Sequence, residues 1–484
     1  MTNYLLSYRI RGGFMQFEEY TLKQSFESIG MWTPDYKQLD AAVTGVLSVA
    51  EGKNLLKLFG FTNHFENKRM IYGYTEDGKL IWIPNFRLPD DSKSDSRFAV
   101  ISIVVEEFYL FDVNPGHFTG SNMIADAFTQ IFHNSRFDFQ VHQLSFSTNY
   151  LLEWMGQQAY DFDEKENSEL HIPYGTVKSE QYQLPNQLLL QFDLKQSISQ
   201  KETGLHIDNA AEVTIQKQNA NKTWFKRFYK EALSVVKLMD FLGGWINEFV
   251  FLHFEINPGI RGSYIFQQNH TTSDYTEQEV HTTFLDLEHN MEKVLLNYMN
   301  KRNKLDLVLD DYLSEFYMVE FYETKLLNSI RTLEIFHRNF IDPRERIPTD
   351  EGMDAARKQI IGFINNHVPE EYQGRFRSQV YYQPEKSLRK RMDYLIKNLP
   401  DDVFDLLQIK MPKRRKSRSI GSFVNRLIET RHYYTHGDNP ENYPSRIVEL
   451  DQIKHVNRVM RKICLYYVYK ELGITEELIL RKLR

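Results

Sequence analysis

The apolar residues of this chain follow two different patterns on either side of a polar stretch at residues 267–283. Before it, short runs rich in β-branched and aromatic residues alternate with turn signals, as in Leu80–Ile83 and Phe249–Ile256. After it, apolar residues recur every three or four positions, as on one face of a helix. The pattern predicts an α+β chain of two domains: residues 1–270, mostly antiparallel sheet with inserted helices, and residues 271–484, an all-α bundle.

Local signals predict individual elements within each domain. In the first, Thr75–Gly78 is typical of a hairpin turn, and apolar spacing predicts a helix at Trp224–Leu242. In the second, Gly and Pro residues separate the helical patterns. The helices expected there are Leu285–Met299, one or two helices within Leu305–Phe340, Glu351–His367, Pro384–Asn398, and a last major helix marked by Ile447–Tyr467 that ends at Gly473.

Composition limits the class of protein. The chain has 484 residues and a net charge of −6, so a uniformly basic nucleic-acid binder is excluded, whereas a local basic groove is allowed. Its single cysteine, Cys464, excludes a disulfide framework and a cysteine-based zinc site. The N-terminus lacks a signal-peptide pattern, and no apolar run is long enough to cross a bilayer. We therefore expect a cytoplasmic protein without a membrane partner.

One short stretch combines residues that can do chemistry: Arg431, His432 and His436, followed by Gly437. Apolar residues at helical spacing lead into it, and Gly437 begins a polar run that predicts the end of the helix. His436 is therefore expected in the last helical turn or just beyond it. Unpaired carbonyl groups at that end of a helix favour the protonated form of an imidazole.

An arginine and a histidine placed this way suit the cleavage of RNA. A 2′-hydroxyl attacks the adjacent phosphate, the phosphorane needs positive charge, and the leaving 5′-oxygen needs a proton. Arg431 can supply fixed charge and paired N–H donors, and His436 can move the proton, without any metal. Because the two residues are five positions apart, they diverge on an ideal helix. They converge only if the helix end relaxes or if a second copy completes the site.

Other interpretations fit the same residues. Arg431 can simply pair with a carboxylate while His436 caps the helix. His432, His436 and Asp438 can instead bind a metal ion, although no further His or Cys group supports this. A basic run precedes the helix that is expected to carry Arg431 and His436. It is either a solvated loop or a segment that binds an RNA backbone. Its members are Lys410, Lys413, Arg414, Arg415, Lys416 and Arg418.

At Arg431–His436 the sequence resembles the HEPN superfamily, whose R-x4-6-H motif marks helical, metal-independent ribonucleases. The preceding pattern, in which Leu326, Ile330 and Leu333-Glu334 recur at helical spacing, fits this resemblance. The whole chain resembles the ApeA group of anti-phage defence proteins, which join a large N-terminal domain to a C-terminal HEPN domain. In the N-terminal part this rests on Phe26–Gly30 leading to Trp32, and on Ile71–Ile83.

The resemblance implies a function and partners. Arg431 would hold the phosphate, His436 would act as acid and base, and His432 would assist, with no cofactor. The substrate would be RNA, with tRNA anticodon loops as one target class, cut to 2′,3′-cyclic phosphate and 5′-hydroxyl ends. A homodimer or higher even oligomer through the HEPN domain, a phage-derived trigger and abortive infection are also implied. A non-catalytic RNA- or protein-binding module is the alternative, and the variant His436→Ala separates the two.

Overall fold

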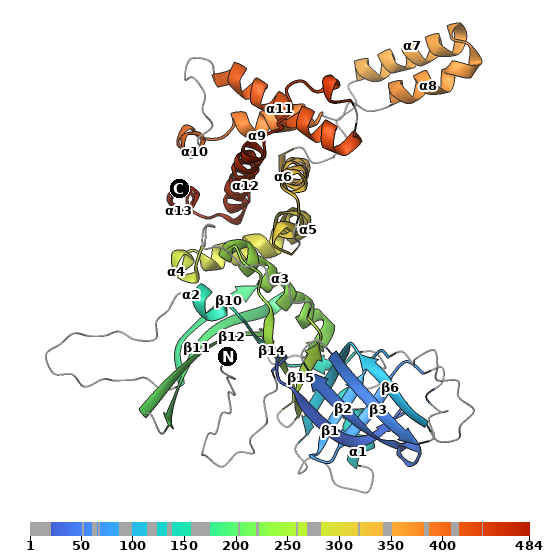
Figure 1. Ribbon diagram of the computed structural model, residues 1–484, viewed down its shortest axis with the longest axis vertical. Helices are drawn as coiled ribbons and strands as arrows, with labels where there is room; N and C mark the ends of the chain where they lie inside the picture. The colour runs from blue at the N-terminus through green and yellow to red at the C-terminus, as the bar shows by residue number, and fades with distance from the viewer. Residues whose placement is uncertain are drawn as a thin grey trace, which may run out of the picture. The chain divides into compact units, whose positions relative to one another are not determined.

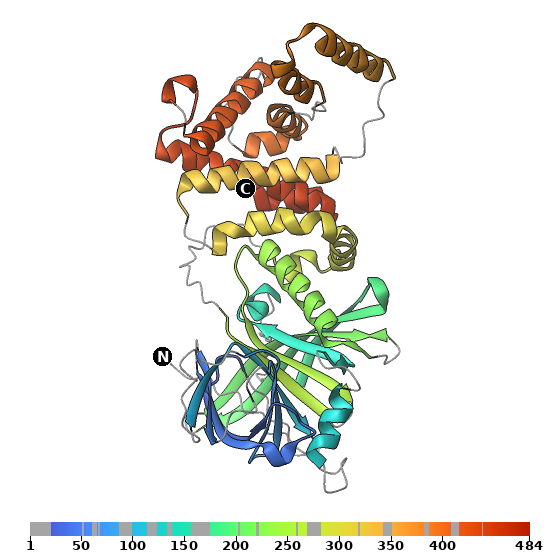
Figure 2. The ribbon, with the colours of Figure 1, turned by 90° about the vertical axis from the view of Figure 1, so that its right-hand side faces the viewer.

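The computed structural model has two compact units, Met1–Glu292 and Lys293–Arg484, whose elements are labelled in Figure 1 and seen from a second side in Figure 2. The domain boundary predicted at residues 270 and 271 lies outside the described residues. The structure describes residues 21–50, 53–60, 65, 68–86, 99–113, 123–132, 138–155, 175–201, 204–218, 222–257, 260–268, 282–317, 320–341, 351–381, 387–407, 416–437 and 439–484.

The first unit is built on an antiparallel sheet. Its strands are hydrogen-bonded in the order β10-β11-β12-β9-β14-β15-β7-β5-β4-β1-β2-β3-β6, while β8 and β13 pair separately. The strands are Phe26–Thr33 (β1), Val43–Ala50 (β2), Lys53–Gly60 (β3), Ile71–Thr75 (β4), Lys79–Ile83 (β5), Ala99–Val105 (β6), Glu107–Val113 (β7), Gln140–Val141 (β8), Gln143–Thr148 (β9), Gly175–Leu184 (β10), Leu188–Lys201 (β11), Gly204–Lys217 (β12), Thr223–Trp224 (β13), Phe249–Asn257 (β14) and Ile260–Phe266 (β15). Its helices are Met123–Phe132 (α1), Leu151–Met155 (α2), Phe225–Gly243 (α3) and Phe284–Leu287 (α4).

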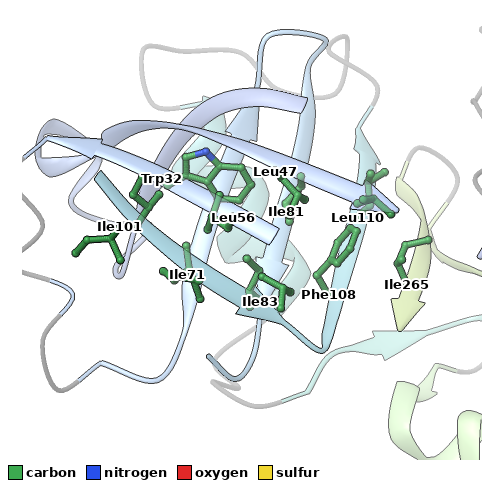
Figure 3. Close-up of a cluster of buried hydrophobic side chains, with 14 of the residues drawn as sticks. Trp32, Leu47, Leu56, Ile71, Ile81, Ile83, Ile101, Phe108, Leu110 and Ile265 are labelled. Atoms are coloured by element: carbon green, nitrogen blue, oxygen red, sulfur yellow. The ribbon is translucent and has the colours of Figure 1, made fainter. Parts of the chain in front are cut away.

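The strands β1 to β7 surround an apolar core, shown in Figure 3. Alternate residues of each strand point inward, as the two-residue period of a strand requires. Trp32 is fully buried there and lies against Gly73 of β4. A Cβ atom at position 73 would lie 2.4 Å from the indole ring, so this strand can pass the ring only with glycine.

Helix α3 packs on the sheet next to β14 and β15. The Phe225 ring lies 5.3 Å from that of Phe254, and the Tyr229 ring 5.3 Å from that of Tyr264, both edge to face. Such aromatic pairs add to the free energy of apolar burial. The high content of Phe and Tyr therefore serves the core of the first unit.

The second unit is helical. Helix α12 is its central element, because its side chains between Val459 and Tyr469 are buried on almost every side. Cys464 lies in this buried stretch, and burial raises the pKa of its thiol to about 12, so it is a packing residue. The helices are Met291–Tyr317 (α5), Tyr322–Phe336 (α6) with the π-helical turn His337–Ile341, Glu351–His367 (α7), Glu370–Tyr381 (α8), Leu388–Lys397 (α9), Asp401–Leu406 (α10), Lys416–His436 (α11), Leu450–Leu472 (α12) and Glu476–Leu483 (α13).

A buried polar network joins α5, α6 and α12. Arg461 Nη1 lies 2.9 Å from Glu315 Oε2, and the two side chains are 9% and 8% exposed. Ser329 donates to Asn457 Oδ1 at 2.5 Å, and the Arg461 guanidinium lies 4.2 Å from the centre of the Tyr312 ring. Buried charges of this kind persist because they are paired and hydrogen-bonded.

Most of the predicted elements are confirmed. The predicted α+β fold is present, β4 and β5 form the predicted hairpin, and α3 and α7 occupy the predicted ranges. The prediction of one helix at Leu285–Met299, separate from the next at Leu305, is wrong. Helix α4 ends at Leu287, and α5 begins at Met291 and runs without interruption to Tyr317. Its polar residues 300–304 disturbed the apolar pattern, yet Lys301 binds the Glu471 carboxylate at the end of α12. Helix α8 was not predicted, since its side chains are mostly exposed.

Candidate active site at the end of α11

Helix α11 presents one buried face and ends at the motif. Ile420, Val424, Leu427 and Thr430 recur every three or four residues and are at most 2% exposed. The predicted helix end is confirmed, because His436 is the last helical residue and Gly437 follows with φ +64°. Glycine adopts this left-handed conformation without steric cost, and its N–H donates to the Tyr433 carbonyl at 2.9 Å.

The chain then returns along the side of α11. Ser445 N–H donates to Glu429 Oε2 at 2.6 Å, and Ile447 N–H donates to Thr430 Oγ1 at 2.8 Å. Arg446 lies over the Tyr433 ring, with its guanidinium carbon 4.7 Å from the ring centre. These contacts hold residues 439–447 beside the motif.

The two histidines lie next to each other on one face. Their ring centres are 5.6 Å apart and the ring planes differ by 19°. His432 is half-buried and its ring lies 6.3 Å from that of Tyr443, in a nearly parallel orientation. His436 is exposed to solvent. The two imidazoles can therefore both reach one molecule bound at this end of the helix.

The surroundings of His432 make it less basic than an ordinary histidine. Partial burial, followed by the nearby charges of His436 and Arg431, lowers the pKa of His432 below its usual value near 6.5. A lowered pKa leaves this imidazole neutral at pH 7. A neutral imidazole nitrogen can accept a proton.

Arg431 contacts helix α6, which Figure 1 shows beside α11 and α9. Its Nη2 lies 3.5 Å from Glu334 Oε2, and its side chain is 32% exposed. The other oxygen of Glu334 accepts a hydrogen bond from Arg338 Nη2 at 2.7 Å. The structure therefore contains the carboxylate contact that the alternative interpretation of Arg431 requires.

Family models match nearly the whole chain. The model described as ApeA N-terminal domain 1 matches residues 27–298, and the model described as Apea-like HEPN matches residues 327–478. The first covers more than half of the sequence, and the order of the two is that of the predicted architecture. The chain belongs to the ApeA family. It is a HEPN-type defence protein.

The HEPN match contains every residue of the site described above, from Glu334 on α6 to Ile447 after α11. HEPN domains are generally ribonuclease domains and often form dimers. No curated protein and no solved structure compared with this ApeA-family chain matches it significantly. None of the described helices combines the length and the hydropathy that crossing a membrane requires.

The other predicted site residues lie apart from the motif or outside the described residues. Four of them lie outside the described residues: Lys410, Lys413, Arg414 and Arg415. Lys416 and Arg418 belong to the first turn of α11. Since a helix rises 1.5 Å per residue, the backbone of Lys416 is about 22 Å from that of Arg431. An RNA strand reaching both would have to span several nucleotides.

The alternative metal set cannot be assembled from the described residues. Asp438 lies outside them, and among those described no group of three His, Cys, Asp or Glu side chains is arranged as metal ligands. Sequence reasoning did not assign roles to Glu334, Arg338 or Tyr443. The first two are about 100 positions before the motif, so only a helical pattern around Glu334 pointed to that region.

Proposed function

We propose that this ApeA-family chain is a metal-independent endoribonuclease of anti-phage defence. The observation that supports it best is the arrangement at the open end of α11. There His432 and His436 have ring centres 5.6 Å apart, and Arg431 immediately precedes His432. Two imidazoles and a guanidinium supply a proton acceptor, a proton donor and fixed positive charge.

Each side chain has a role in the proposed reaction. The 2′-oxygen forms a bond to phosphorus while the bond from phosphorus to the 5′-oxygen breaks. His432, neutral because its pKa is lowered, accepts the proton of the 2′-hydroxyl. Protonated His436 donates to the departing 5′-oxygen, and Arg431 binds the non-bridging oxygens. The products are a 2′,3′-cyclic phosphate and a 5′-hydroxyl end.

The proposed enzyme is a homodimer whose two motifs share one groove. An α-helix turns about 100° per residue, so Arg431 and His436 point about 140° apart on α11, whereas His432 and His436 differ by about 40°. The helix does not relax at its end, because it remains α-helical through His436. Arg431 of one copy would therefore act together with the histidines of the other.

The proposed substrate is single-stranded or loop RNA. In-line attack needs a linkage that can rotate, and a regular RNA duplex restricts it. Among such substrates we propose tRNA anticodon loops, whose loss would stop translation and cause abortive infection after a phage-derived trigger. The basic run Lys410–Arg418 is proposed to contact the RNA backbone.

The first test is cleavage by the purified full-length chain, with and without an extract of phage-infected cells that supplies the proposed trigger. A tRNA substrate is incubated in excess chelator, and the RNA ends are sequenced. We expect cleavage with cyclic phosphate ends for the wild type and none for His436→Ala. Unchanged cleavage by His436→Ala would remove that residue from the mechanism. Binding of tRNA without any cleavage by the wild type would favour the non-catalytic binding module instead.

The second test asks whether the site is shared between copies. Arg431→Ala and His436→Ala are each expected to be inactive. When they are mixed and allowed to exchange subunits, a heterodimer keeps one intact shared site out of two. Since half of the dimers are mixed, about one quarter of the wild-type activity should return. Failure to recover activity, with subunit exchange demonstrated, would place Arg431 and His436 in one copy.

A further inference from the structure

Glu334 is shared unequally between two arginines. Its Oε1 accepts a hydrogen bond from Arg338 at 2.7 Å, whereas its Oε2 lies 3.5 Å from Nη2 of Arg431. The first distance is that of a strong charge-assisted hydrogen bond, and the second is too long for one. The negative charge of Glu334 is therefore balanced mainly by Arg338.

This arrangement orients Arg431 without neutralising it. A guanidinium has five N–H donors, and Arg431 approaches Glu334 through Nη2. The Arg431 side chain is 32% exposed, while Glu334 is 13% exposed. The remaining N–H groups of Arg431 can thus bind a phosphate.

Glu334 and Arg338 lie next to a well-packed part of the helical bundle. Arg338 and the fully buried His337 begin the π-helical turn that follows α6. The Nδ1 atom of His337 lies 3.2 Å from Nη1 of the buried Arg391 on α9, and its ring meets the Tyr394 ring edge to face. Glu334 is one helical turn before this packed region, so its carboxylate has little freedom to move when Arg431 changes its conformation.

We propose that Glu334 is a positioning residue for Arg431, and that Arg338 balances its charge so that Arg431 remains available for the RNA phosphate. This inference rests on the proposed ribonuclease function. A long arginine side chain has many rotamers, and a misplaced catalytic group slows a reaction strongly even over about 1 Å. Glu334 would restrict Arg431 to the side of α11 that faces α6.

The experiment compares steady-state cleavage of one RNA substrate by variants of the full chain. Glu334→Gln keeps the shape of the side chain but removes its charge. We expect kcat to fall on the order of 10- to 100-fold, while KM stays within about twofold, because phosphate charges are still attracted. Glu334→Asp keeps the charge but withdraws the carboxylate from Arg431 by one methylene group, so we expect kcat to fall, although less than in Glu334→Gln.

Arg338→Met tests the second half of the inference. Without Arg338, Glu334 becomes free to bind Arg431 closely and reduce its charge, so KM should rise. In the double variant Glu334→Gln/Arg338→Met the rise in KM should disappear. If KM stays raised in the double variant, Arg338 itself binds RNA and the charge-balancing role is wrong.

Controls separate the possible failures. Asp393 and Lys397 on α9 form an ion pair four residues apart, as Glu334 and Arg338 do on α6. Asp393→Asn removes this pair and should leave kcat unchanged. Inactivity of the wild type would count against the proposed function. Wild-type kcat for Glu334→Gln, in a preparation in which His436→Ala is inactive, would instead overturn the positioning role alone. If Glu334→Gln does not fold, Glu334→Asp decides, and unchanged kcat and KM at Glu334→Asp overturn the role.

Discussion

Replacing Thr430 with valine should detach the segment that runs beside the motif. Thr430 is fully buried, donates to the Arg426 carbonyl at 2.7 Å and accepts from Ile447 N–H at 2.8 Å. Valine has nearly the same shape but no hydroxyl. The Arg426 carbonyl keeps its helical hydrogen bond, whereas the buried N–H of Ile447 loses its acceptor.

The size of the effect follows from that one unpaired donor. An unsatisfied buried N–H costs about 1–3 kcal/mol. The residues 439–447 should therefore open roughly 5- to 150-fold more often than in the wild type. Because this segment carries Tyr443, which lies beside His432, RNA cleavage should fall as well.

Hydrogen exchange measured by mass spectrometry on the full chain tests this directly. The peptide that contains Ile447 should exchange faster in Thr430→Val by the stated factor. Thr430→Ser is the matched control, because it removes a methyl group and keeps the hydroxyl. Wild-type protection in Thr430→Val, or equally fast exchange in Thr430→Ser, would refute the assigned hydrogen bond.

Three further outcomes are expected. Gly73→Ala should destabilise the first unit by about 1–3 kcal/mol in thermal unfolding, since its Cβ would lie 2.4 Å from the Trp32 ring. Arg461→Met should destabilise the second unit by about 3–5 kcal/mol in urea, since it leaves the buried Glu315 charge without its ion-pair partner. Partial burial and the nearby charges of His436 and Arg431 lower the pKa of His432 in the folded state, so its imidazole binds a proton more readily in the unfolded chain. Stability of the second unit should therefore fall as the pH drops below about 6.5, and less in His432→Gln.

Local patterns along the sequence were sufficient to predict many of the helices and strands. Alternating and helical apolar spacing predicted a sheet domain followed by a helical domain, because these periods depend only on backbone geometry. The glycine at 437 predicted the end of the motif helix, since a left-handed residue favours glycine. The R-x4-H pair and the helical pattern beside it indicated Arg431 and His436, because both signals lie within one short stretch of the chain.

Contacts between distant segments could not be predicted from such local sequence patterns. The polar residues 300–304 hid the continuity of α5, whose Lys301 binds Glu471 of a helix more than 150 positions later. Likewise, the pairing of Glu334 with Arg431 depends on how α6 packs against α11. The sequence by itself determined the fold class and the motif, because both depend on residues near one another in the chain. Only the tertiary structure decided which carboxylate meets Arg431, because that contact depends on the packing of whole helices.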